Sequence, residues 1–141
     1  MDAIEKKDSE PTKAAFSNEK YQVYVLAKNI YKLKLQSNIE LDANDAIEIR
    51  SNFLSLSNGK KWGVLVDAEN FFSTTSEFRQ LSASKEYTDL RLALAIVTNS
   101  MATKIIGNFF IKVNKPASPT KLFSNEKQAF EWLKRLLLSQ Q

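Results

Sequence analysis

Two apolar runs in the middle of the chain constrain its fold more than any other feature. Residues 62–66 (WGVLV) and residues 90–98 (LRLALAIVT) are apolar at nearly every position, as strands buried on both faces of a parallel sheet are. Two parallel strands in one sheet need a long crossover connection, which is usually a helix. The sequence therefore predicts an α/β fold with a mainly parallel sheet covered by helices.

A hairpin precedes these runs. Residues 21–27 (YQVYVLA) and residues 30–36 (IYKLKLQ) alternate as strands do, and the short turn Lys28-Asn29 separates them. Lys32 and Lys34 fall on one side of the second strand, and this pattern predicts an antiparallel pair with one face open to water. The hairpin supplies the antiparallel part of an otherwise parallel sheet.

Helical spacing and one further strand complete a β-β-α-β-α-β-α-β-α order with right-handed crossovers. A helix is expected from the N-cap Asp42 to Gly59, another opens with the capping box Thr74–Glu77, and Ser124 is the expected cap of the last helix. The short strand is residues 120–123, TKLF. The helix predicted over residues 100–113 is expected to bury one apolar stripe, made of Ala102, Ile105, Ile106, Phe109, Phe110 and Val113.

Composition limits the chemistry. The 141 residues include no cysteine and no histidine, which excludes disulfides, Ser-His and Cys-His triads, and zinc sites built on those side chains. We expect a flexible arm over residues 1–19 and one domain over residues 20–141. The start of the chain does not look like a signal peptide and no apolar run is long enough to span a membrane, so a cytoplasmic protein without membrane insertion is expected.

The net charge of +4 is carried by residues 100–141, which hold seven Lys/Arg and two Glu. These basic residues are spread over two predicted helices and a loop, without a dense run or a nucleic-acid-binding motif. We interpret them as a solvated surface and expect no nucleic-acid partner.

The stretch from residue 63 to residue 80, GVLVDAENFFSTTSEFRQ, is the candidate functional region. Ligands of open α/β sheets gather beyond the carboxyl ends of the strands, and Asp67 stands at such an end. The predicted working face comprises Asp67, Glu69, Asn70, Ser73, Thr74, Thr75, Ser76, Asn99 and Ser100.

One interpretation of this region is a metal-dependent nuclease. The residues DAEN at 67–70 look like the opening D-x-E/D-N of NYN/PIN-type nucleases, which implies a bound Mg²⁺. One carboxylate cannot hold a hard cation and activate water, so further acids would have to converge. The next strands end in IVTNS and KLFSNE, without an aspartate at either tip.

A second interpretation follows from a resemblance that covers residues 21–138. The order of elements, with WGVLVDAENFFSTTSEFRQ, LALAIVTNS and FFIKVNKPASPTKLFSNEKQAFEWL, resembles the STAS/SpoIIAA-like fold of the bacterial anti-sigma-factor antagonists and the related SEC14-like domains. The resemblance implies a non-catalytic regulatory or protein-interaction module without a metal or cofactor, with a protein partner that could be a second copy of the chain.

The same resemblance bears on two further properties. In the antagonists a phosphorylated serine follows the strand-end residue by nine positions, which corresponds to Ser76, although Thr75 and Phe78 replace the aspartate and glycine of that motif. Ser73, Thr74 and Thr75 are the alternative hydroxyls. The SEC14-like relatives imply instead a carrier of an apolar small molecule or lipid, with a cavity near Phe109 and Phe110.

A third interpretation is purely structural. Asp67 would accept hydrogen bonds from the loop that follows it, and Thr74 would only cap a helix together with Glu77. Phe71 and Phe72 would fill the core.

Overall fold

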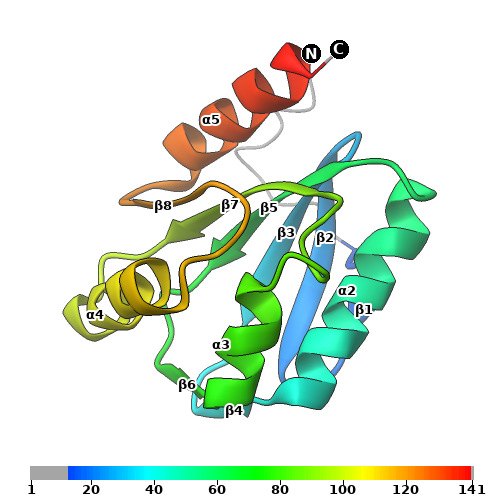
Figure 1. Cartoon of the computed structure of the whole chain (residues 1–141). Helices are drawn as coiled ribbons and strands as arrows, with labels where there is room; N and C mark the ends of the chain where they lie inside the picture. The colour runs from blue at the N-terminus through cyan, green and yellow to red at the C-terminus, as the bar shows by residue number, and fades with distance from the viewer. Residues whose placement is uncertain (1–12, 141) are drawn as a thin grey trace.

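The computed structural model describes residues 13–140. A six-stranded sheet lies at its centre, with the strand order β1-β2-β3-β5-β7-β8, and helices flank both of its faces (Figure 1). Its strands are β1 (Phe16–Ser17), β2 (Tyr21–Ala27), β3 (Ile30–Leu35), β5 (Trp62–Asp67), β7 (Arg91–Val97) and β8 (Thr120–Phe123). The helices are α2 (Ala43–Ser57), α3 (Ser76–Ala83), α4 (Met101–Phe109), a π-helical turn η1 (Phe110–Asn114) and α5 (Glu126–Ser139).

The pairing of the strands confirms the predicted fold class. β3, β5, β7 and β8 run parallel to one another, while β1, β2 and β3 pair antiparallel. The hairpin turns at Lys28-Asn29, where Asn29 has the positive φ of 62° that asparagine tolerates better than most residues. A mostly parallel sheet with a leading antiparallel hairpin is the expected STAS-like arrangement.

Three short strands were not predicted. β4 (Ile39–Leu41) and β6 (Phe72–Thr74) pair parallel as a separate two-stranded sheet. β1 lies within residues 1–19, the predicted arm, of which residues 1–12 fall outside the described part of the chain. Each of the three has only two or three residues, too few to show a recognisable alternation.

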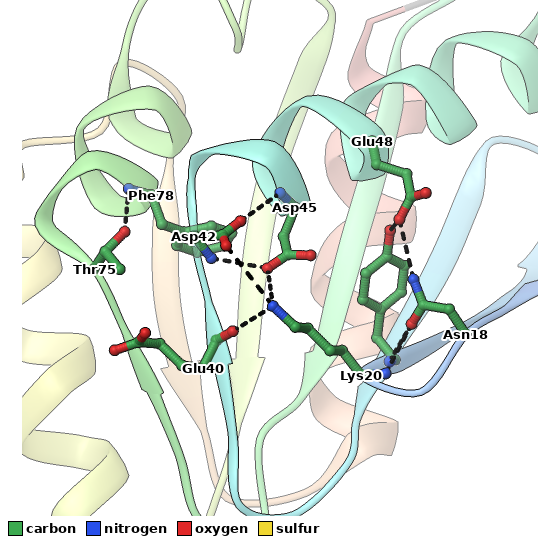
Figure 2. Close-up of polar contacts among 9 residues, drawn as sticks. Asn18, Lys20, Glu40, Asp42, Asp45, Glu48, Thr75 and Phe78 are labelled. Atoms are coloured by element: carbon green, nitrogen blue, oxygen red, sulfur yellow. Dashed lines mark hydrogen bonds and ion pairs between the residues drawn. The ribbon is translucent and has the colours of Figure 1, made fainter.

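A polar network ties the hairpin to the start of α2 (Figure 2). Asp42 caps the helix as predicted, and its side chain and that of Asp45 each accept the other's backbone N–H, a complete capping box. Lys20 Nζ donates to Asp45 Oδ2 at 2.7 Å, and the Tyr21 hydroxyl donates to Glu48. Burial and the nearby Glu48 carboxylate raise the pKa of Tyr21, so its hydroxyl remains a proton donor at neutral pH.

Two apolar cores lie on opposite faces of the sheet. On one face the sheet packs against α2 and α3, with Phe53, Trp62 and Phe110 among the buried side chains. On the other face α5 covers β5 and β7, with Leu65 and Leu133 at the centre. Gly63 allows this close packing, because a Cβ at that position would lie 3.1 Å from Leu133 Cδ2.

The predicted water-exposed face of the hairpin is wrong at Lys32, whose side chain is only 2 % exposed. The first turn of α5 lies above this part of the sheet, and Lys32 Nζ donates to Glu126 Oε1 at 3.0 Å. Alternation along β3 correctly separated two faces but could not show that a helix from the far end of the chain covers the second one.

Two helix caps differ from prediction by one residue. Thr75, rather than Thr74, caps α3 and accepts the N–H of Phe78 at 3.1 Å. Asn125, rather than Ser124, caps α5 and accepts the N–H of Gln128 at 2.8 Å. In both places two adjacent residues have capping side chains, so composition alone cannot choose between them.

The predicted apolar stripe of α4 is only partly buried. Ile106 and Phe110 point inward, whereas Ala102, Ile105, Phe109 and Val113 are exposed. Apolar residues occur nearly all around this helix, so periodicity does not select its inner face. Gly107 lies on the buried side, where a Cβ would come within 2.8 Å of Leu122 Cδ2, so glycine lets α4 approach β8 without displacing that side chain.

No helix within residues 13–140 is long and apolar enough to cross a membrane.

Candidate functional site

The carboxyl ends of β3 and β5 and the start of α5 meet around a buried lysine. Lys32 Nζ lies 3.0 Å from Glu126 Oε1 and 3.9 Å from Asp67 Oδ2. Asp67 also accepts the backbone N–H of Glu69 at 3.3 Å, so it turns the chain as the structural interpretation predicts. The charge of Asp67 is therefore directed at a lysine of the protein itself.

Glu69 and Asn99 join the loops that follow β5 and β7. The Glu69 carboxylate accepts the backbone N–H of Asn99 at 2.9 Å and its side-chain amide at 3.2 Å. The Asn99 amide also donates to the carbonyl of Ser124, and Asn70 donates to the carbonyl of Leu35. Glu69 and Asn99 therefore come together beyond the carboxyl ends of β5 and β7, whereas Asn70 contacts the carboxyl end of β3.

The predicted hydroxyl cluster is divided among different structural roles. Thr74 Oγ1 accepts from Arg79 Nη1 at 2.7 Å, and Thr75 caps α3. Ser73 lies in β6, and Ser76 is the exposed first residue of α3. The hydroxyl of Ser100 caps α4 by accepting the N–H of Thr103 at 3.3 Å.

Phe71, just before β6, and Phe72, its first residue, differ in burial. Phe72 is buried in the core as expected, but Phe71 is 63 % exposed. The expectation that both fill the core is wrong for Phe71, since adjacent residues of an extended segment point to opposite sides. Phe71 instead presents an aromatic surface next to the strand-end loops.

Within residues 13–140, no three acidic side chains are grouped so that they could hold a metal ion. The nuclease interpretation required at least three converging carboxylates at Asp67. That geometric basis is missing from the part of the chain that the structure describes.

A cavity of about 140 Å³, partly open to solvent, lies between the sheet and the layer formed by α2, α3 and α4. Side chains from β3, β5 and β7 form its floor, and most of the lining is apolar. The SEC14-like interpretation placed a cavity near Phe109 and Phe110; Phe110, Gly107 and Ile106 do line it, while the Phe109 side chain is exposed.

Three arginines, Arg50, Arg79 and Arg91, interrupt the apolar lining, and no acidic residue lines the cavity. Arg91 donates to the carbonyl of Ser82 and to the hydroxyl of Ser118, each at 2.9 Å. Burial of its guanidinium lowers the pKa of Arg91 to about 10, so the group remains charged at neutral pH.

Sequence reasoning missed these arginines. The available signal was Arg91, a charge near the start of an otherwise apolar strand run. Arg50 and Arg79 carried no such signal, because charged residues are common on the exposed sides of helices.

The order and pairing of the strands and helices give the STAS-like α/β fold that the sequence predicts, and comparison with known proteins agrees with this fold. The chain belongs to the DUF7793 family, a domain of unknown function whose pattern matches residues 24–137. No curated protein matches the sequence.

Solved structures with a similar fold include the following two. An uncharacterised DUF3478-family protein with a SpoIIAA-like fold, from Shewanella loihica PV-4, has a TM-score of 0.58 at 13 % identity, covering 84 % of this chain and 98 % of that one. The phosphorylated form of the Bacillus cell fate determinant SpoIIAA has a TM-score of 0.44 at 16 % identity, covering 79 % of this chain and 97 % of that one. The first similarity confirms the predicted fold and carries no statement about function.

Proposed function

We propose that this protein is a non-catalytic binding module that holds a small apolar ligand between its sheet and α2–α4. The cavity is the observation that carries this proposal. Packed proteins leave few apolar spaces larger than a water molecule, and an enclosed engineered apolar cavity of about 150 Å³ binds benzene. The cavity here is partly open to solvent, which gives a ligand a way in. A cavity of about 140 Å³ with a mostly apolar lining has the size and chemistry for a comparable guest.

Filling the cavity tests the proposal. The side chain of Ala46, on α2, lines the cavity, so Ala46→Leu places additional carbons inside it without weakening the helix. We expect octan-1-ol to bind the parent protein in isothermal titration calorimetry and the variant at least about tenfold more weakly, which corresponds to about 1.4 kcal/mol.

Ala102→Leu is the matched control, because Ala102 is an exposed residue of α4 that does not line the cavity. It should leave octan-1-ol binding unchanged. Equal binding by the parent and Ala46→Leu would place the alcohol elsewhere, and the absence of binding to the parent would remove the proposal.

A second candidate function is a protein-interaction surface regulated by phosphorylation. It is supported by the exposure of Ser76 at the first turn of α3 and of Phe71 in the preceding loop. A phosphate on Ser76 would lie near free N–H groups and the positive end of the helix dipole. Glu77 beside it would oppose the added charge.

Under this second candidate function, the protein would act in the cytoplasm and bind another protein. A second copy of the same chain, forming a homodimer, is one such partner. Ser76→Asp should change the set of proteins that co-purify with the chain, whereas Ser76→Ala should retain the same set as the parent. If both variants retain the same proteins as the parent, Ser76 has no role in the interaction.

A further inference from the structure

We infer that the cavity selects an apolar acid, with a body of about six to eight carbons and one carboxylate, over neutral ligands of the same size. This inference rests on the proposed ligand-binding function and specifies the ligand. It follows from the charges in the cavity wall, from N–H groups that lack an acceptor, and from the position of both along the sheet.

Two of the three arginines in the wall have no ion-pair partner among the described residues. Arg79 and Arg91 donate only to neutral acceptors, and no carboxylate within the described residues 13–140 forms an ion pair with either. Arg50 has one ion pair, at 3.5 Å to Asp89, whose side chain is 60 % exposed. Positive charges beside an apolar space favour an anion there, because the low local dielectric strengthens their attraction.

Three buried N–H groups of the lining have no hydrogen-bond acceptor. They are Arg50 Nε, Trp62 Nε1 and Arg79 Nε, and all three residues line the cavity. Buried donors are almost always paired in folded proteins, and leaving one unpaired is costly. A carboxylate has two oxygens that only accept hydrogen bonds, so it can satisfy such donors, whereas an alkylammonium group has no acceptor and cannot.

Two of these donors lie at the same end of the cavity. Trp62 opens β5 and is the register partner of Arg91 at the start of β7. Arg50 approaches the same end, since its guanidinium lies over the ring of Tyr87 and pairs with Asp89, just before β7. The carboxylate is therefore expected at the amino-terminal ends of β5 and β7.

The apolar body then has a defined direction. Val64 and Val66 on β5, with Leu94 and Ile96 on β7, continue the cavity lining along the strands away from Trp62 and Arg91. A short alkyl or aryl group bound at this end would follow those side chains. Arg50 and Arg91 at this end select the head group, and the strands accommodate the carbon body. The Arg79 guanidinium is held at the other end of α3 by the carbonyl and hydroxyl of Thr74.

Calorimetric titration of the full chain with octanoate, octan-1-ol and octylammonium tests the inference. We expect octanoate to bind at least about tenfold more tightly than octan-1-ol, the gain typical of a hydrogen bond to a charged group, and octylammonium to bind most weakly. Arg50→Met should reduce the preference for octanoate to about threefold or less, while binding of octan-1-ol remains.

Arg135→Met is the matched control, because Arg135 is exposed on α5, which packs against the opposite face of the sheet. It should retain the full preference for octanoate.

Trp62→Phe keeps an aromatic ring but removes the N–H group, and it should also lower the preference for octanoate. If circular dichroism shows that Arg50→Met does not fold, Trp62→Phe alone tests the inference.

The possible results separate the two proposals. Equal binding of octanoate and octan-1-ol leaves the apolar binding function intact and overturns the selection of an acid. A preference that is unchanged in both Arg50→Met and Trp62→Phe also overturns the inference. Failure of every ligand to bind removes the proposed function as well.

Discussion

At the first turn of α3, two neighbouring threonines contribute differently to stability. Thr75 Oγ1 accepts the N–H of Phe78, whereas Thr74 Oγ1 accepts from Arg79, which also donates to the carbonyl of Thr74. Thr75→Ala should lower the free energy of unfolding by about 1 kcal/mol, the usual cost of losing an N-cap. Thr74→Ala should cost less, because the bond from Arg79 to the backbone carbonyl remains.

Urea denaturation of the two variants measures this difference, and Thr75→Ser should preserve the cap. A larger cost for Thr74→Ala than for Thr75→Ala would contradict the structure and support the capping box between Thr74 and Glu77.

The cap of α2 makes stability depend on pH. The N–H of Asp45 donates to the Asp42 carboxylate and holds the pKa of Asp42 below its ordinary value of 3.8. Because the folded-state pKa is lowered, the carboxylate stabilises the fold above the ordinary pKa, and this contribution is lost as the pH falls through the lowered value. Asp42→Asn keeps a capping side chain but cannot titrate.

The urea midpoint of Asp42→Asn should therefore fall less than that of the parent between about pH 5 and about pH 2. Glu86→Gln, at an exposed position, is the control and should follow the parent. Parallel curves for the parent and Asp42→Asn would show that the cap contributes nothing to the acid sensitivity.

At the scale of elements, α4 and η1 show how packing divides an apolar helix into two faces. Phe110 is 7 % exposed and lines the cavity, while its neighbour Phe109 is 46 % exposed. Phe110→Ala should lower the free energy of unfolding by about 3 kcal/mol. Phe109→Ala should cost less than about 1 kcal/mol, mainly through its contact with the Arg79 guanidinium.

Equilibrium denaturation of this matched pair checks the orientation of α4. Similar costs for the two phenylalanines would mean that both are buried in solution, by a partner or by a different packing of the helix.

At the scale of the whole molecule, one sheet joins two cores. Trp62 lies in the core on the α2 and α3 side, and Trp132 packs against Phe123 on the α5 side. Leu133→Ala, which removes a fully buried side chain of the α5 core, should cost about 3 kcal/mol. Because both cores share the same strands, we expect the weakened protein still to unfold in one cooperative transition.

Single-tryptophan versions of Leu133→Ala test this expectation. With Trp62→Phe or Trp132→Phe in that background, the remaining tryptophan reports on one core, and its fluorescence transition should coincide with the one from circular dichroism. A Trp132 signal that changes at lower urea than the circular dichroism signal would show that α5 separates from the sheet first.

Local sequence determined much of this protein. The apolar runs of β5 and β7, the alternation in the hairpin and the N-cap Asp42 predicted the main sheet and its helices but not the short strands β1, β4 and β6. Strand and helix periods and capping residues act over a few neighbouring positions. The same reasoning placed Asp67, Glu69 and Asn99 at one edge, since carboxyl ends of parallel strands meet there.

Only the tertiary structure decided which surfaces are covered and what lies between the layers. Lys32 is buried beside Glu126, the first residue of α5 near the other end of the chain, and Ile105 is exposed while its neighbour Ile106 lines the cavity. The cavity and its arginines depend on side chains from α2, α3, β5 and β7 together. A void between packed layers is a property of how distant segments fit, and no local period along the chain encodes it.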